Sequence, residues 1–361
     1  RVRRVAGPLI AILVALFAVQ TQAQFLPFGR NKIAYTPFDW HVLKTDHFDI
    51  YYYPEMEELA RNGAAYAEQS YKALEQRFCF TIMHRIPLIF YSSQIHFQQT
   101  NVTPGFIPEG VGGFFEFMKG RVVIPSMGTQ EQFRHVINHE LVHVFMHNKV
   151  EQVLRDHNLP IERYPPLWFV EGLAEFYSTR WDSQAEMLLR DAVLNGYFVP
   201  VSSIGMISGS FLMYKEGQAA LEFMAKEYGP ETVVQLIDNL WKSADFNEVI
   251  EWTIGKEVRE FDRAWMKALR KQYYPLFAAK DRAAEMSRAV ATTGFNAKPV
   301  FVKTGDSSSV VFVGNNSGYS SLYRVSLRGG GEPELLLQGE KTDEIEAFHI
   351  GADYVSMMAA R

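Results

Sequence analysis

The sequence predicts an α+β fold, because strand-like and helix-like patterns occupy separate stretches of the chain. Residues 40–125 hold strand-like runs around one helical segment, and residues 130–276 repeat their apolar side chains at helical spacing. From residue 292 onward, short apolar runs alternate with Gly, Ser and Asn turns. We therefore expect a small mixed sheet, then a mostly helical half, then a second strand-rich region.

The opening region predicts two strands with a helix between them. Residues 40–53 alternate in polarity and are rich in aromatic residues, which favours a strand that ends at Pro54. Apolar residues at helical spacing predict a helix over residues 55–78. Residues 87–91 then predict a short apolar strand.

Glycines flank the next strand-like segment, at residues 105–125. Gly112 and Gly113 precede Phe114, where the aromatic part of the segment begins. The pattern is typical of a hairpin or a glycine-flanked edge strand. Such a strand either binds an extended peptide along its free edge or simply covers the core, and the sequence leaves both open.

The middle and the end of the chain are predicted from periodicity. Helical spacing predicts helices over 130–148, 167–181, 211–228, 231–240 and 256–276, with a loop over 156–166. A charged, alanine-rich segment at 280–291 predicts a linker. Short strands are expected at 300–302, 310–313, 321–325 and 334–337.

The first residues have the layout of an export signal. Arginines at positions 1, 3 and 4 precede an uncharged, largely apolar run over residues 6–19. Ala23 and Thr21 then fit the small-residue rule for cleavage, which predicts a signal peptide over 1–23. An uncleaved anchor is the alternative. Either way the body is expected in the periplasm or cell envelope, or secreted, with no membrane span in the mature chain.

Composition narrows the function further. The net charge of -5 provides no basic surface, so nucleic acid is not an expected partner. Cys79 is the only cysteine, which excludes an intramolecular disulfide. Its neighbours Phe78 and Phe80 predict that it lies in the core.

The segment from His139 to His143 has the pattern His-Glu-x-x-His inside a predicted helix. Spacing of i and i+4 places both imidazoles on one face, where they can bind one Zn²⁺. Glu140 lies beside them, and a carboxylate next to a metal-activated water can take its proton. His135 and His147 continue the spacing of four, but one helix cannot arrange four imidazoles around one ion. We interpret those two as helix-surface or outer-shell residues.

A second predicted helix supplies carboxylates for the third ligand, Glu171 and Glu175, within the segment Trp168 to Phe176. His-Glu-x-x-His followed by this Trp-led Glu-Gly-x-Ala-Glu helix resembles the gluzincin clan of zinc metallopeptidases. The likeness is greatest to the exported bacterial peptidase-MA-like family, and more distant to the thermolysin and aminopeptidase N families. It covers residues 40–274 and implies a metallopeptidase domain over 24–279.

The resemblance implies a role for each carboxylate. Glu171 corresponds to the third zinc ligand, and Glu175 to the acidic residue that steadies a zinc-bound histidine. If Glu175 were the ligand instead, the two roles would be exchanged. Tyr214, in the segment Tyr-Lys-Glu-Gly, resembles the tyrosine that stabilises the oxyanion in aminopeptidase N-like families. An ordinary core tyrosine is the alternative.

The segment that holds a free amine in aminopeptidases, Gly-x-Met-Glu-Asn, is not found in this sequence, and Glu116 is a weak match to its glutamate. An endopeptidase is therefore expected over an aminopeptidase. The metzincin pattern is disfavoured because Met146 and Lys149 stand where it needs glycine and histidine.

The strand-rich end resembles another family. The segment Ser317 to Tyr323, followed by Gly329 to Glu332, looks like a blade of a TolB-like β-propeller. Residues 292–361 would then form a partial, incomplete propeller able to recruit a protein partner. Three readings of the whole follow: a zinc-dependent endopeptidase acting on a peptide or protein, a catalytically silent envelope binding or scaffold protein, or an aminopeptidase.

Overall fold

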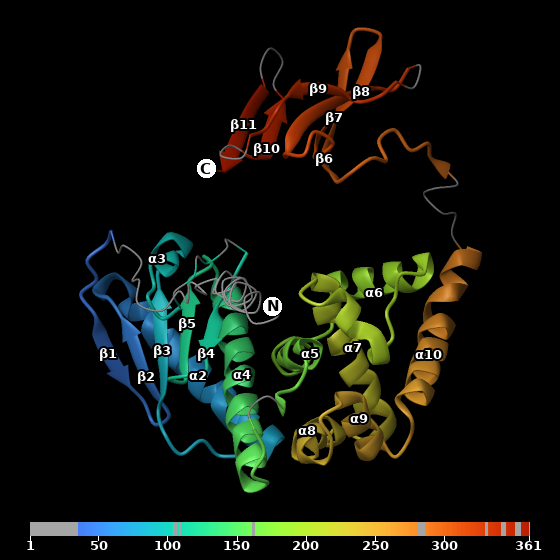
Figure 1. Ribbon diagram of the computed structural model, residues 1–361. Coiled ribbons are helices and arrows are strands. Elements are labelled where there is room, and N and C mark those ends of the chain that lie inside the picture. The colour runs from blue at the N-terminus through green and yellow to red at the C-terminus, as the bar shows by residue number, and fades with distance from the viewer. Residues whose placement is uncertain are drawn as a thin grey trace, which may run out of the picture. The chain divides into compact units, whose positions relative to one another are not determined.

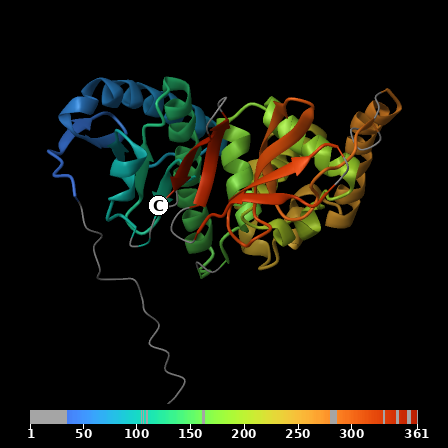
Figure 2. The ribbon, with the colours of Figure 1, turned by 90° about the horizontal axis from the view of Figure 1, so that it is seen from above.

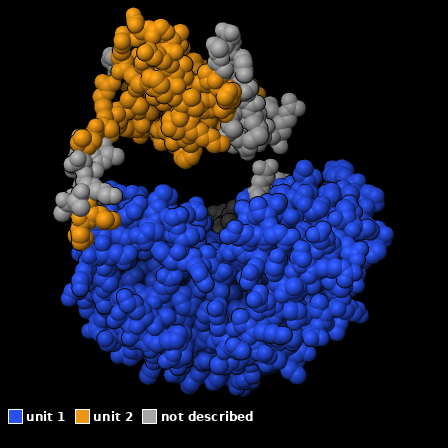
Figure 3. All heavy atoms as spheres, turned by 180° about the vertical axis from the view of Figure 1, so that it is seen from behind, with its two compact units in different colours: residues 1–273 blue, residues 274–361 orange. Residues whose placement is uncertain are grey.

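The computed structural model describes residues 35–103, 105, 107, 110–160, 163–279, 286–328, 331–340, 344–350 and 355–360. The predicted signal peptide at 1–23 lies outside these ranges, and the predicted linker is described only from residue 286 on. Two compact units divide the chain between Tyr273 and Tyr274 (Figure 3). No helix in the described ranges combines the length and the apolar character needed to cross a membrane.

The first unit is α+β, as predicted, with a small mixed sheet. Its strands are β1 (His41–Lys44), β2 (Phe48–Tyr52), β3 (Ile86–Tyr91), β4 (Phe114–Glu116) and β5 (Arg121–Pro125). Their order is β1-β2-β3-β5-β4. The β2–β3 and β3–β5 pairs are parallel, and both outer pairs are antiparallel. The expected edge strand is β4.

One predicted strand is in fact a hairpin. Residues 40–53 bend back on themselves between β1 and β2, where the Thr45 backbone N–H donates to the Phe48 carbonyl at 2.9 Å. The Thr45 side chain in turn accepts a hydrogen bond from the Phe48 N–H at 3.1 Å. The alternating pattern gave no sign of this turn, because the residues on both sides of it alternate in the same way.

Two long helices, α2 (Glu57–Phe78) and α4 (Gln130–Asp156), pack against each other and against the sheet (Figure 1). Gly63 permits the close approach, because a Cβ there would lie 2.6 Å from the Phe90 ring. Cys79 ends α2 in the left-handed conformation, with φ 46°. It is exposed, so the predicted core position was wrong. As the C-cap residue it lies beyond the last turn of α2, where the backbone leaves the helix.

The helical half contains more helices than the sequence predicted. After η1 (Pro54–Met56) and α3 (Gln94–Gln98) in the sheet half come α5 (Leu167–Ser178), α6 (Ser183–Asn195), η3 (Val201–Ile207), α7 (Phe211–Tyr228), α8 (Thr232–Asp238), η4 (Leu240–Lys242), α9 (Phe246–Ile254) and α10 (Val258–Ala279). Helices α6 and α9 were not predicted, and α4 runs on past residue 148 to Asp156, where the predicted loop begins. Figures 1 and 2 show α4 between the sheet and the helices α5 to α10.

The second unit contains an antiparallel sheet of four strands in sequence order: β6 (Asn296–Thr304), β7 (Ser307–Gly314), β8 (Ser321–Ser326) and β9 (Glu334–Leu337). Strands β10 (Glu344–Ile350) and β11 (Val355–Ala360) form a separate pair. Side chains alternate across β7: Val311 and Val313 pack on one face, and Phe312 packs on the other.

Candidate metal centre

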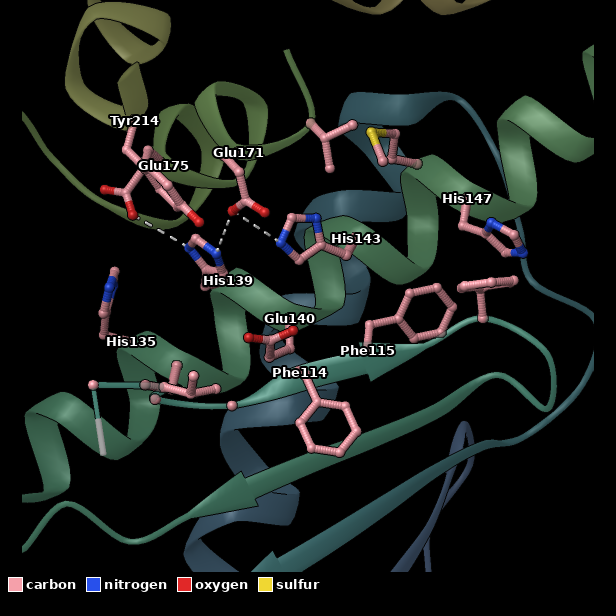
Figure 4. Close-up of a pocket in the computed structure, with 18 of the residues that line it drawn as sticks. Phe114, Phe115, His135, His139, Glu140, His143, His147, Glu171, Glu175 and Tyr214 are labelled. Carbon is pink, nitrogen blue, oxygen red and sulfur yellow. Dashed lines mark ion pairs between the residues drawn. The ribbon is translucent and has the colours of Figure 1, made fainter. Parts of the chain in front are cut away.

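Helix α4 presents two imidazoles on one face. Its N-cap is Thr129, whose side chain accepts a hydrogen bond from the Gln132 backbone N–H at 3.2 Å. His139 and His143 are one helical turn apart, and their ring centroids are separated by 5.0 Å. Figure 4 shows both rings directed toward α5.

Helices α5 and α7 touch at two glycines. A Cβ on Gly172 would lie 2.7 Å from the carbonyl carbon of Gly217, and a Cβ on Gly217 would lie 2.7 Å from the carbonyl oxygen of Trp168. Only residues without a side chain allow the two backbones to come this close. Because the two helices are in contact, Glu171 and Glu175 of α5 line the same cavity as Tyr214 of α7.

Glu171 faces both imidazoles. Its Oε2 lies 3.5 Å from Nε2 of His139 and 3.5 Å from Nε2 of His143, as the dashed lines in Figure 4 mark. Hydrogen bonds from N–H to O are usually shorter, at about 2.7–3.2 Å. Two donors that each lie about 2.1 Å from a tetrahedral ion are about 3.4 Å apart. The three donor atoms thus have a spacing that could hold a metal ion, and all lie within 4.8 Å of one another.

His139 also belongs to a second group, with His135 and Glu175. Its Nδ1 lies 3.4 Å from Oε1 of Glu175. Two members of this group also contact residues outside it: Lys215 Nζ donates to Oε2 of Glu175 at 2.6 Å, and Nδ1 of His135 lies 3.0 Å from Oγ1 of Thr179. A cation bound here would share Glu175 with a buried ammonium group. The first group is therefore the better candidate for a metal site.

The two carboxylates hold His139 in its charged form. Burial disfavours the imidazolium, but Glu171 and Glu175 outweigh it and raise the pKa of His139 to about 10. Burial likewise opposes ionisation of the two carboxyls, but His139 and His143 lower the pKa of Glu171 to about 2, and His139 and Lys215 lower the pKa of Glu175 to about 2. A metal ion bound to the first group would take the place of the His139 proton.

Glu140 lies beside this pair and is 5% exposed. Its Oε2 is buried and has no hydrogen-bond partner among the described residues. Burial raises the pKa of Glu140, although the neighbouring imidazoles act to lower it. A carboxyl with a raised pKa and an unpartnered oxygen is suited to take up a proton and return it.

Tyr214 borders the same cavity from α7. Burial, together with Glu171, Glu140 and Glu175, raises the pKa of Tyr214 to about 12. The phenol therefore keeps its proton at neutral pH and can donate a hydrogen bond. Tyr214 therefore shares the cavity wall with the carboxylates, and its role in catalysis stays a prediction.

The predicted peptide-binding residues Gly112, Gly113 and Phe114 all line the cavity, which has a volume of about 870 Å³. Gly113 lies against α4, where a Cβ would be 2.9 Å from Val136 and 3.3 Å from Oε1 of Glu140. A side chain at this position would press on Glu140. The ring of Phe114, by contrast, packs on Phe97 at a centroid distance of 5.6 Å.

Several residues of the site were missed or misread from the sequence. Phe115 turns its ring to His147, at a centroid distance of 5.4 Å, because side chains alternate along β4. His147 was assigned to the helix surface or an outer shell, but it is 6% exposed and borders the cavity. Lys215 stood inside the Tyr-Lys-Glu-Gly segment. Nothing in that segment indicated that the Lys215 ammonium group would form an ion pair with Glu175.

Comparisons with known proteins do not add to this picture. The sequence matches no protein-family model and no curated protein.

Proposed function

We propose that this chain is an exported zinc-dependent endopeptidase that cleaves a peptide or protein. One observation carries the proposal: a single oxygen of Glu171 lies 3.5 Å from Nε2 of both His139 and His143. The carboxyl of Glu140, whose Oε2 has no hydrogen-bond partner among the described residues, borders the same cavity. Three donors and a nearby base are the parts that metal-assisted hydrolysis needs.

The donor set suits zinc. Two imidazoles and one carboxylate are ligands that zinc accepts in catalytic sites, where a further position stays open. His139, His143 and Glu171 would hold the ion, and Glu175 would fix the orientation of the His139 ring through Nδ1. When bound, zinc would act as a Lewis acid that polarises a carbonyl and makes water more acidic.

The protein groups would handle the proton and the developing charge. Glu140 would take a proton from the attacking water as the oxygen of that water bonds to the peptide carbonyl carbon. Glu140 would then return that proton to the amide nitrogen as the C–N bond breaks, so that a carboxyl product and an amine product form. Tyr214 would donate a hydrogen bond to the former carbonyl oxygen, which carries negative charge at that stage.

The cleft favours cleavage within a chain over removal of a terminal residue. β4 is the edge strand beside α4, so an extended peptide can pair with it. Glu116, the weak match to an amine-binding glutamate, is already bound: its Oε2 accepts a hydrogen bond from Nε of Arg121 at 2.9 Å. Its Oε1 accepts another from the Met118 N–H at 2.8 Å. This carboxylate is engaged by its own hairpin and is not among the described residues that line the cavity, which speaks against a role in holding a substrate's α-amine.

The second unit is proposed to recruit a protein partner. Its four strands follow one another in an antiparallel meander, which is the arrangement of a propeller blade. The export part of the proposal rests on residues 1–23.

The test is to purify the chain from Gln24 onward and to measure bound metal and casein cleavage, with and without a chelator. We expect about one zinc per chain and cleavage that the chelator abolishes. Glu140→Gln should keep the zinc and lose the cleavage. Glu131→Gln, which changes an exposed glutamate on the same helix, is the matched control and should behave as wild type.

A chain that binds no zinc would overturn the metal site. A chain that binds zinc but cleaves neither casein nor other unfolded proteins would instead favour the scaffold reading.

A further inference from the structure

The cavity follows α4 and has two unlike ends. His135 and His147 both line it, and the pair His139 and His143 lies between them. Twelve residues of helix separate the two ends, which corresponds to about 18 Å. An extended peptide rises about 3.3 Å per residue, so about five substrate residues could lie along this distance.

The His135 end is the more polar one, although Phe211 also lines the cavity there, with Lys215 Nζ 5.4 Å from its ring centroid. Oγ1 of Thr179 lies 3.0 Å from Nδ1 of His135. Glu175 also lines the cavity and is held in a buried ion pair with Lys215, with Nζ and Oε2 2.6 Å apart. Polar groups that already satisfy one another offer little to an apolar substrate side chain.

The His147 end is walled by rings. Centroid distances from His147 are 5.4 Å to Phe115, 6.0 Å to Phe117 and 5.9 Å to Tyr164. The four rings come from three parts of the chain: α4, the hairpin that contains β4, and the loop before α5. All four border the cavity, as does Met146. Phe117 is 66% exposed, so this wall is open to an incoming group.

His147 contributes to this wall as an uncharged ring. Its side chain is buried, and Nδ1 has no hydrogen-bond partner among the residues the structure describes. Glu151 lies on the far side of the ring, with Oε1 3.4 Å from Nε2. Burial lowers the pKa of His147, against the opposing effect of Glu151. A neutral imidazole among three aromatic rings offers an apolar surface.

We propose that the His147 end is a specificity subsite that takes a large aromatic side chain next to the scissile bond. The inference rests on the proposed function and deepens it by naming the substrate class. Aromatic side chains bury the most apolar area and pack edge-to-face against other rings, which this wall of four rings allows. The cavity is continuous from these rings to Glu140, so the aromatic residue lies close to the bond that is cut.

The experiment measures binding separately from cleavage. The zinc-loaded Glu140→Gln chain is titrated into fluorescein-labelled, alanine-rich decapeptides that carry one Phe, one Glu or only Ala, and anisotropy gives each Kd. We expect the Phe peptide to bind about 10–30-fold more tightly than the Ala peptide, and the Glu peptide no more tightly than the Ala peptide.

Two further substitutions locate the effect. His147→Trp, made in the same Glu140→Gln chain, fills the subsite and should reduce the ratio of the Ala and Phe dissociation constants to about one. Tyr164→Ala removes one wall and should reduce it by a smaller factor, which provides a second test if the bulky variant does not fold. His157→Ala is the control, because His157 lies at the end of α4 and stacks on Trp241, outside the cavity.

Each outcome decides the proposal. Equal Kd values for the Phe and Ala peptides, no peptide binding at all, or a ratio that both subsite variants leave unchanged would each overturn it. If the Phe preference is found and depends on His147, the subsite stands. Failure of the wild-type chain to cleave the same peptides would then count against the peptidase function alone.

Discussion

Two groups of the same composition, two histidines and one glutamate each, share His139 and differ in what surrounds them. In the group with His143 and Glu171, no described residue outside the group donates a hydrogen bond to the Glu171 carboxylate. In the group with His135 and Glu175, Lys215 also bonds Oε2 of Glu175, and Thr179 also lies within hydrogen-bond distance of Nδ1 of His135. Residue types and spacing therefore do not distinguish the two groups. The contacts of their side chains with residues outside each group do.

The largest expected difference between the groups is in metal binding. His143→Ala removes one of three donors from the first group, so zinc content should fall from about one per chain to a trace. His135→Ala removes a donor from the second group and should leave the zinc content unchanged. Elemental analysis of both variants after dialysis measures the difference.

Circular dichroism serves as the folding control for this pair. The opposite result, with zinc lost from His135→Ala and retained in His143→Ala, would place the metal in the second group and exchange the roles of Glu171 and Glu175.

A smaller difference is expected for Tyr214, which should act only on a substrate held at the first group. Tyr214→Phe should lower kcat by about 10²–10³-fold while KM and zinc content change little, because the hydroxyl matters mainly when charge develops on the carbonyl oxygen. Tyr66→Phe is the control, since its hydroxyl bonds Gln130 at the helix start. A higher KM with kcat unchanged would instead show that Tyr214 contributes to substrate binding and not to stabilising the charged oxygen.

The sequence predicted the parts of the molecule that follow from local pattern. Helix α7 was predicted with the bounds that the structure has, and His139 and His143 share a face because the helical period requires it. The pairing of α5 with α7 at Gly172 and Gly217 was not predicted, because a close backbone approach depends on both helices together.

Other features were present in the sequence but were passed over. Helix α6 has both of its end signals: Asp182, whose side chain accepts from the Ala185 N–H at 2.8 Å, and Gly196 in the left-handed conformation. The burial of His147 and the contact of Lys215 with Glu175 gave no local signal. Each depends on elements that lie far apart in the sequence.

The link between the groups through Glu175 gives a third, weaker effect. Glu175→Gln removes the charge that faces Nδ1 of His139 and should weaken zinc binding about 10–100-fold without abolishing it. Glu222→Gln changes another partly buried carboxyl, which accepts from Gln218 on the same helix, and should leave the affinity unchanged. Competition with a chelating dye measures both affinities. A complete loss of zinc in Glu175→Gln would mean that Glu175 is itself a ligand.

The smallest effect is a dependence on pH, which follows from the charge that Glu171 and Glu175 place on His139. Its pKa of about 10 in the metal-free chain lies above the ordinary value of 6.5, so its stabilising interactions are complete below pH 6.5 and are lost as the pH rises toward 10.

Zinc must displace this proton, so zinc affinity should rise about tenfold per pH unit between pH 7 and 8.5. Calorimetry in buffers of different ionisation enthalpy should detect about one proton released per zinc bound at pH 7.5. His135→Ala should release the same number, since burial lowers the pKa of His135 and leaves that ring neutral at this pH. Release of no proton would mean that His139 is already neutral, and that the carboxylates of α5 do not hold it charged as the structure indicates.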